Sequence, residues 1–251
     1  ERFLKAGIME EGKYYDTDSG TPQGGVVSPI LANVYLHYVL DIWFEKKLKG
    51  EIRGFTSMVR YADDFVIMVQ FKSEARKIRQ ILEERVKEFN LELSSKKTRT
   101  IEFGKYAKEN AEKKGKKPDS FDFLGFTHYC DKTRKGNFKV GRKTRKKKFS
   151  LKIREMNLWL KAQRNRGKIR DWWYDLAAKL RGHYEYYGIS GNFQGIRKYY
   201  RQTLKLVFKW INRRSQKKSM TLKQFFKYLE DYPLPKPEIK HHLYTLYGYV
   251  K

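Results

Sequence analysis

The sequence predicts an α+β fold in which an antiparallel sheet with packed helices precedes an all-α segment. Residues 58–71 and 121–140 each contain paired apolar runs separated by turn residues, a pattern typical of antiparallel hairpins. From about residue 145 the hydrophobic residues recur at helical spacing. We therefore expect two domains, residues 1–145 and 146–251.

The first helices are predicted from their end signals and their spacing. Residues 2–6 are typical of the last turn of a helix. After a turn-rich stretch over residues 16–25, Ser28 and Pro29 form a favoured helix start. Apolar residues then recur at helical spacing, which predicts a helix over residues 29–47.

A hairpin with an acidic turn follows this helix. Two runs rich in Val, Ile, Phe and Tyr lie within residues 58–71, and the three residues between them include Asp63 and Asp64. A helix is expected over residues 75–89, because its apolar residues share one helical face. A short strand over residues 91–93 is expected after it.

The second half of the chain changes from strands to helices. Residues 106–120 are lysine-rich and predict a mobile loop. Two runs, residues 121–130 and 137–140, predict another hairpin. The helical segment after it is expected to contain helices over residues 149–164, 170–187, 193–213 and 221–229.

The composition indicates a globular protein with a polyanionic partner. The formal net charge is +28, from 56 Lys and Arg against 28 Asp and Glu, and 40% of the 251 residues are hydrophobic. This charge exceeds what solubility requires, so nucleic acid is the first candidate partner. An anionic membrane surface is the second.

Membrane insertion and disulfide bonding are not expected. The most apolar stretch, residues 30–44, is interrupted by Asn33, His37 and Asp41, so it is unsuited to span a bilayer. The single cysteine, Cys130, excludes an internal disulfide. Since no signal peptide opens the sequence, we expect an intracellular location.

Asp63 and Asp64 concentrate negative charge in an otherwise basic chain. Adjacent carboxylates on a turn between apolar strands suit a hard divalent cation such as Mg²⁺, which also binds substrate phosphates. The alternative is that both aspartates simply favour the turn.

Five segments together resemble a known family. They are residues 20–33, 60–64, 91–98, 121–126 and 180–188. The first four resemble, in order and approximate spacing, successive motifs of reverse transcriptases. The first, GTPQGGVVSPILAN, is similar to the group II intron lineage, including its CRISPR-associated bacterial relatives. The last, LRGHYEYYG, resembles the thumb of that lineage, also called the maturase or X domain. The resemblance implies a partial right-hand polymerase palm followed by an all-α thumb.

The resemblance also implies roles for individual residues. Asp63 would be a catalytic metal ligand, with Asp64 as its neighbour, and Tyr61 would lie close to the primer end. Gln23 and Gly24 match positions that contact the template and the incoming nucleotide. An ordinary glycine loop before a helix is the alternative for this segment.

Two further matches concern proton transfer and the primer. Lys97 matches a lysine proposed to protonate the departing pyrophosphate, which is chemically sensible for an ammonium group near polyphosphate. A solvated surface lysine is the alternative. Leu124 and Gly125 match the primer grip, whereas Phe121, Phe123 and Phe126 are typical of core aromatics without the family.

One departure from the family affects the metal site. Reverse transcriptases need another aspartate on a palm strand upstream of the glycine-rich motif, and nothing in residues 1–19 resembles that strand. In that family the fingers domain also precedes the glycine-rich motif, and we expect it to be missing from this chain as well. We therefore expect a two-metal Mg²⁺ site that an aspartate outside this chain completes, and we expect this chain alone to be inactive.

A basic stretch joins the two expected domains. Between Asp131 and Glu155 there is no acidic residue, and lysines and arginines crowd the passage from hairpin to helices. Four candidates for gripping a nucleic-acid backbone are Arg142, Lys143, Arg145 and Lys146. The alternative is a mobile, solvated run of charge.

These observations favour an RNA-directed DNA polymerase of the group II intron type that also binds its intron RNA and assists splicing. Its partners would be an RNA template and DNA primer duplex, intron RNA, deoxynucleotides and the missing amino-terminal half, in a bacterial cytoplasm or an organelle. The alternatives are a non-catalytic RNA-binding splicing cofactor and one half of a split reverse transcriptase.

Overall fold

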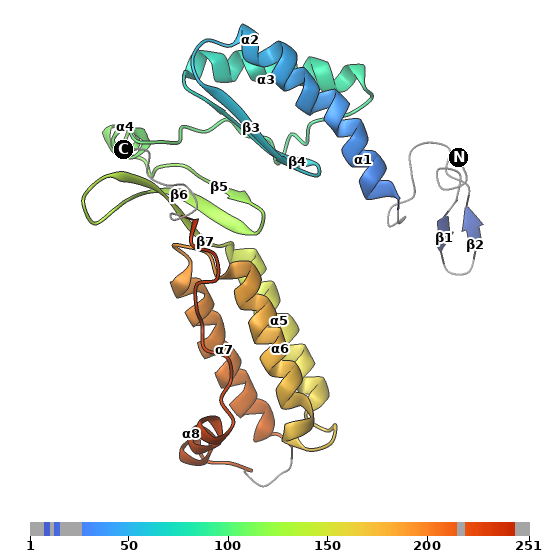
Figure 1. The fold of residues 1–251 in the computed structure, drawn as a ribbon, viewed down its shortest axis with the longest axis vertical. Helices are drawn as coiled ribbons and strands as arrows, with labels where there is room; N and C mark the ends of the chain where they lie inside the picture. Colours follow the sequence, from blue (N-terminus) through green and yellow to red (C-terminus); the bar gives the residue numbers. More distant parts are fainter. Residues whose placement is uncertain (1–7, 11–12, 16–26, 215–218, 244–251) are drawn as a thin grey trace. The chain divides into compact units, whose positions relative to one another are not determined.

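Two compact units make up the chain, Glu1–Glu102 and Phe103–Lys251. The structure is a computed structural model that describes residues 8–10, 13–15, 27–214 and 219–243 (Figure 1). The helix predicted over residues 2–6 and the turn-rich stretch over residues 16–25 lie outside the described residues.

The first unit contains a short antiparallel pair, β1 (Ile8–Glu10) and β2 (Lys13–Tyr15), and then one long helical segment (Figure 1). The predicted helix is confirmed, and it runs four residues further than expected. Its parts are α1 (Ser28–Leu36), η1 (His37–Ile42), η2 (Phe44–Leu48) and α2 (Lys49–Glu51), where η denotes the wider π-helical hydrogen bonding. Pro29 lies in the first turn, where its missing N–H leaves no helical bond unmade.

The acidic hairpin and its helix are also confirmed. Strands β3 (Thr56–Tyr61) and β4 (Asp64–Val69) pair antiparallel, and α3 (Lys72–Glu88) follows. Ile78, Leu82 and Val86 recur every fourth residue of α3, and this spacing places them together in the core of the unit. The other buried members of this core are Val39, Leu40, Trp43, Phe44, Leu48 and Ile52.

The strand predicted over residues 91–93 is wrong. Leu91 and Leu93 pack against the core of the first unit, as their alternation indicates, but within the described residues this segment has no strand pairing. Alternating apolar residues can turn their side chains inward without forming a strand. A strand additionally needs a neighbour for its backbone groups, and no alternation pattern specifies that neighbour.

The second unit begins with two departures from the expected elements. Helix α4 (Ala107–Lys113) occupies the predicted loop, with Ala107 buried. The run over residues 121–130 is two strands, because Leu124 and Gly125 adopt positive φ angles of 47° and 79° and reverse the chain. The result is a three-stranded antiparallel sheet of β5 (Ser120–Phe123), β6 (Phe126–Lys132) and β7 (Phe138–Thr144).

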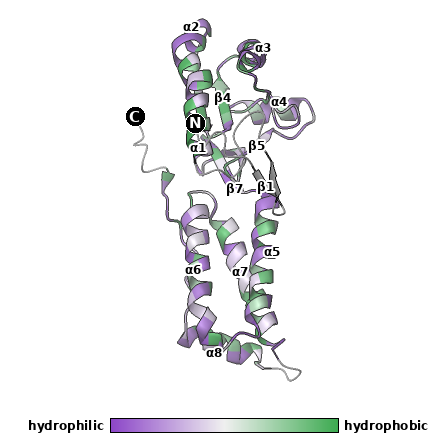
Figure 2. Ribbon diagram, turned by 90° about the vertical axis from the view of Figure 1, so that its right-hand side faces the viewer, coloured by the Kyte–Doolittle hydropathy of each residue, from purple (hydrophilic) through white to green (hydrophobic). Residues whose placement is uncertain are grey.

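The predicted helices of the second half are all confirmed. They are α5 (Lys146–Gln163), α6 (Ile169–Tyr187), α7 (Phe193–Ile211) and α8 (Leu222–Asp231). The first three run side by side, with the sheet at one end and α8 at the other (Figure 1). Each carries both hydrophilic and hydrophobic residues along its length, as helices with one buried face do (Figure 2). Trp173, Leu176, Leu180 and Tyr184 of α6 are buried together, as their spacing predicts.

Asn192 connects the sheet to the helices within this unit. Asn192 is 1% exposed. Its side chain accepts a hydrogen bond from the Thr144 amide at 2.9 Å and donates one to the Tyr187 carbonyl at 2.9 Å. The boundary predicted near residue 145 coincides with the passage from β7 to α5, although the sheet belongs to the same compact unit as the helices. A functional division at that position stays a prediction.

Candidate active site and nucleic-acid interface

Asp63 and Asp64 lie at the tip of the β3–β4 hairpin. Tyr61 pairs with Asp64, so Ala62 and Asp63 form the connection between the strands. Ala62 adopts a φ of 53°, a left-handed conformation that is costly for a residue with a Cβ. Tyr61, Asp63 and Asp64 are all exposed, so this turn presents two carboxylates and an aromatic ring to solvent.

The donor chemistry of this turn fits Mg²⁺. Hard divalent cations take carboxylate oxygens, and Mg²⁺ in particular is commonly held by one or two carboxylates together with substrate phosphates. Asp63 and Asp64 are exposed, consecutive in sequence, and both supply such oxygens. Within the described parts of the chain, no group of three or more His, Cys, Asp or Glu side chains is placed to hold a metal ion. The turn is therefore suited to a cation that phosphate oxygens or further carboxylates complete.

Of the remaining candidate residues in the first unit, the structure describes Lys97 but not Gln23 or Gly24. Lys97 is exposed in a turn closed by a bond from its amide to the Ser94 carbonyl at 3.0 Å. As far as the structure describes the chain, Lys97 forms no ion pair with Asp63 or Asp64. Gln23 and Gly24 lie outside the described residues.

The Leu124–Gly125 turn is held from two sides within the second unit. The Tyr186 hydroxyl donates to the Leu124 carbonyl at 3.0 Å, and the Arg145 amide donates to the Gly125 carbonyl at 2.9 Å. Phe126, buried directly after the turn, stacks on the Tyr186 ring with centroids 6.0 Å apart. The turn is therefore anchored to α6 and to the start of α5. Phe126 is a core aromatic, as predicted, while Phe121 and Phe123 are half-buried.

The four basic candidate residues differ in their solvent exposure. Arg142 is half-buried and its Nη1 is a buried atom without a hydrogen-bond partner among the described residues. Arg145 is half-buried and its Nε is 2.8 Å from Asp122. Lys143 and Lys146 are exposed at the end of β7 and the start of α5. These two side chains are therefore the more accessible of the four for phosphate contacts.

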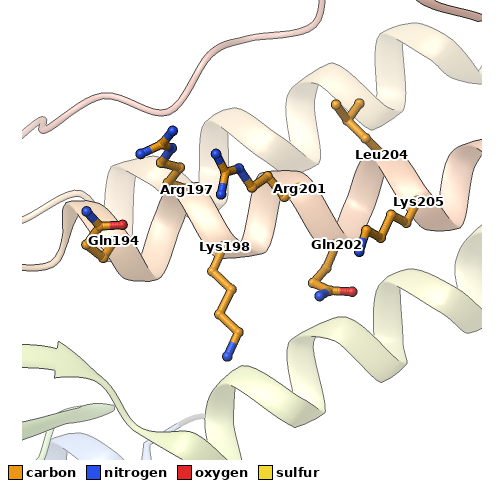
Figure 3. A pocket seen from close by; sticks show the side chains of 7 residues that line it. All are labelled: Gln194, Arg197, Lys198, Arg201, Gln202, Leu204 and Lys205. Atoms are coloured by element: carbon orange, nitrogen blue, oxygen red, sulfur yellow. The ribbon is translucent and has the colours of Figure 1, made fainter.

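A second basic surface lies on α7, and sequence reasoning missed it. A hollow of about 530 Å³ is lined by Gln194, Arg197, Lys198, Arg201, Gln202, Leu204 and Lys205 (Figure 3). Figure 3 shows Arg197 and Arg201 projecting from the same side of the helix. The signal was present in the sequence, because Arg197, Arg201 and Lys205 recur every fourth residue and so share one face.

The aromatic residues of the helices mainly pack against one another. Trp172, Trp173, Tyr187 and Tyr199 are buried in the core of the second unit, whereas Tyr186 is 54% exposed. No helix in the described residues has the length and apolar character needed to cross a membrane.

A comparison with protein families decides the assignment. The sequence model of a family described as "Reverse transcriptase (RNA-dependent DNA polymerase)" matches residues 2–128, which is just over half of the chain. The chain belongs to the reverse transcriptase family. The match includes the Asp63–Asp64 turn and ends within β6, so the helices α5 to α8 lie beyond it.

Curated relatives of this reverse transcriptase chain include proteins of introns. The Group II intron-encoded protein LtrA of Lactococcus lactis subsp. cremoris is 52% identical over 48 residues, 19% of this chain and 8% of LtrA. An uncharacterized 91 kDa protein in the cob intron of Schizosaccharomyces pombe is 50% identical over 50 residues, 20% of this chain and 6% of that protein. Protein YkfC of Escherichia coli is 30% identical over 105 residues, 32% of this chain and 28% of that protein. The segment that matches this chain is less than a tenth of the length of LtrA and of the S. pombe intron protein.

The carboxylates of the acidic hairpin suit the chemistry of the reverse transcriptase family. A reverse transcriptase joins nucleotides by phosphoryl transfer, and carboxylates that hold divalent cations stabilise the attacking and leaving oxygens of that reaction. The exposed turn with Asp63 and Asp64 is a feature of the described residues of the first unit that suits this chemistry. The site roles of individual residues stay predictions.

Proposed function

We propose that this chain is the palm and thumb part of a group II intron-type reverse transcriptase, an RNA-directed DNA polymerase that also binds intron RNA as a maturase. The observation that carries the proposal is the Asp63–Asp64 turn inside the segment that matches the reverse transcriptase family. The similarity to LtrA and to an intron protein of S. pombe supports the group II intron type.

In this proposal Asp63 and Asp64 would hold Mg²⁺ together with an aspartate outside this chain. The cation would stabilise charge on the oxygens of phosphoryl transfer. Tyr61 lies two residues before Asp63 on the same hairpin and contacts the primer end. Lys97 donates a proton to the departing pyrophosphate, and Gln23 and Gly24 contact the template and the incoming deoxynucleotide.

The second unit holds the nucleic acid in this proposal. Leu124 and Gly125 contact the primer, and their anchoring to Tyr186 and Arg145 favours a fixed turn over a flexible one. Phosphate contacts from Arg142, Lys143, Arg145 and Lys146 bind the template and primer duplex without reading its sequence. Lys143 and Lys146 contribute most, since they are the exposed pair.

A non-catalytic RNA-binding splicing cofactor is the second candidate function. The formal net charge of +28 and the basic surface of α7 favour RNA binding whether or not the chain takes part in polymerisation. In that case the first unit would serve as scaffold, and the carboxylates at the turn would have no chemical role.

The replacement Asp63→Asn separates the two functions. We expect it to abolish DNA synthesis nearly completely in the polymerase that carries these residues, because it removes one charged metal ligand and leaves the basic surfaces unchanged. RNA affinity should stay the same. Retention of more than about a tenth of the rate, a loss below ~1.4 kcal/mol of transition-state stabilisation, would contradict the metal role. The 251-residue chain by itself is expected not to extend a primer.

A further inference from the structure

Arg60 connects the acidic hairpin to the long helix of the first unit. It lies in β3 on the same face as Thr56 and Met58, which is the face that packs against the core. Its side chain is 11% exposed. An arginine in such a position needs partners, because burying an unpaired guanidinium is costly.

Among the described residues, the hydrogen-bond partners of this guanidinium lie in the same unit. Nε donates to Asp41 Oδ1 at 2.7 Å and Nη2 to Asp41 Oδ2 at 2.5 Å, a bidentate pair. Nη1 donates to Asn33 Oδ1 at 3.0 Å and to the Ala62 carbonyl at 2.9 Å. The guanidinium therefore bridges two helical positions and the turn.

This network explains the polar interruptions of the apolar stretch over residues 30–44. Asn33, His37 and Asp41 are spaced by four residues along the helical segment. Asn33 and Asp41 accept from Arg60, and His37 Nδ1 lies 3.2 Å from Asp41 Oδ2. The interruptions therefore serve to hold one arginine in place.

The bond to Ala62 bears on the direction of the catalytic carboxylate. The Ala62 carbonyl belongs to the peptide group that joins Ala62 to Asp63, and this group is planar. Ala62 itself has a φ of 53°, a conformation that a residue with a Cβ keeps only when its surroundings hold it there. A rigidly held guanidinium that binds this carbonyl restrains the rotation of the whole peptide plane.

We propose that Arg60 is a positioning residue for Asp63: held by Asp41 and Asn33, it fixes the Ala62–Asp63 peptide and thereby the direction of the Asp63 side chain. This inference rests on the proposed function, in which Asp63 is a metal ligand. Arg60 itself contacts no reacting atom in this arrangement. It acts by keeping the carboxylate in the orientation that a cation requires before the cation arrives.

The first test uses the 251-residue chain without metal. In Arg60→Lys the charge remains, but a lysine has a single ammonium group and loses the forked geometry that reaches Asp41 and Ala62 together. We expect the carbonyl carbon resonance of Ala62 to shift and the Asp63 amide to exchange faster with solvent. Arg85→Lys is the matched control, because Arg85 is a partly buried arginine of the same unit that binds the Val39 carbonyl and Glu88. An unchanged Ala62 resonance and an unchanged Asp63 exchange rate in Arg60→Lys would overturn the proposal.

The second test measures DNA synthesis in the polymerase that carries these residues. We expect Arg60→Lys to lower the maximal rate about tenfold, ~1.4 kcal/mol, and to raise the Mg²⁺ concentration needed for half the maximal rate. The affinity for the primer and template duplex should stay the same. Asn33→Ala, at an exposed position, should have a smaller effect in the same direction, which covers the case that Arg60→Lys folds poorly.

Failure of this inference and failure of the proposed function would give different results in these experiments. If Asp63→Asn abolishes synthesis while Arg60→Lys and Asn33→Ala leave the Mg²⁺ dependence unchanged, the positioning role is wrong and the metal role of Asp63 stands. If Asp63→Asn leaves synthesis intact, the proposed function fails first. A loss of thermal stability in Arg60→Lys without a change in Mg²⁺ dependence would reduce Arg60 to a structural residue.

Discussion

His183 of α6 stacks on Tyr199 of α7, with ring centroids 3.5 Å apart and ring planes 10° from parallel. The Nε2 atom of His183 is buried and has no hydrogen-bond partner among the residues that the structure describes. Burial, and to a lesser extent the charge of Lys152, lowers the pKa of His183 from 6.5 to about 4. The fold therefore holds this imidazole neutral.

The stability of the second unit should consequently fall in acid. A lowered folded-state pKa means that the unfolded chain binds the proton more tightly, so the stabilisation is complete above pH 6.5 and is lost as the pH falls toward 4. The full loss is about 3 kcal/mol. Denaturant unfolding at several pH values measures it, and His183→Gln should flatten the dependence. His242→Gln, at an exposed position of the second unit, is the control. An equally steep dependence in His183→Gln would show that another group is responsible.

A comparison of two glycines can separate a role of Gly125 in primer binding from the effect of backbone strain. Gly125 and Gly136 have similar φ angles of 79° and 82°, so replacement by Ala should cost each a similar ~1 kcal/mol of stability. A Cβ at Gly125 would meet the Tyr187 hydroxyl at 3.4 Å, whereas one at Gly136 would meet nothing within 4 Å. We expect only Gly125→Ala to weaken primer and template binding, measured by fluorescence anisotropy. Equal affinities of the two variants would argue against the primer grip.

Lys96 and Lys97 form a natural pair for testing the proton donor. Both are exposed lysines in the same turn, so they contribute alike to net charge. If Lys97 protonates pyrophosphate, Lys97→Ala should lower the rate of nucleotide addition about 100-fold or more, while Lys96→Ala should change it little. Single-turnover kinetics in the active polymerase measures this step. Similar rates in the two variants would leave Lys97 as a surface lysine.

The basic surface between β7 and α5 predicts a defined change in salt dependence. If all four candidates contacted phosphates, replacing them with Gln would lower the slope of log affinity against log salt by about 3. Arg142 and Arg145 are half-buried. We therefore expect the double variant Lys143→Gln with Lys146→Gln to lower this slope by about 1.5. Titration of a primer and template duplex at several salt concentrations measures the slope.

Two further double variants locate the binding surface. Lys223→Gln with Lys227→Gln removes the same charge from exposed positions of α8 and should leave the slope nearly unchanged. Arg197→Gln with Arg201→Gln tests the hollow on α7. If the α7 pair lowers the slope and the Lys143 and Lys146 pair does not, the duplex binds on α7 instead.

Local patterns predicted most of the elements correctly. The helices after residue 145 and the acidic hairpin follow from periodicity and turn composition, which depend only on neighbouring residues. The family was visible in the same way, because the motif residues lie in short contiguous segments. Three expectations were wrong. The strand over residues 91–93 and the single strand over residues 121–130 failed where a partner strand or a positive φ decided the outcome. Helix α4 formed where a lysine-rich composition had predicted a mobile loop.

The sequence by itself determined the fold class and the position of Asp63 and Asp64 at a turn, and its charge predicted a polyanionic partner. Only the tertiary structure decided which polar residues meet. Asn33 and Asp41 reach Arg60 across 19 to 27 positions of sequence, and Tyr186 reaches Leu124 across 62. Such contacts form because packing brings separate elements together, and a buried donor then requires an acceptor within about 3 Å. Periodicity can place a residue on a face, but it carries no information about what lies opposite.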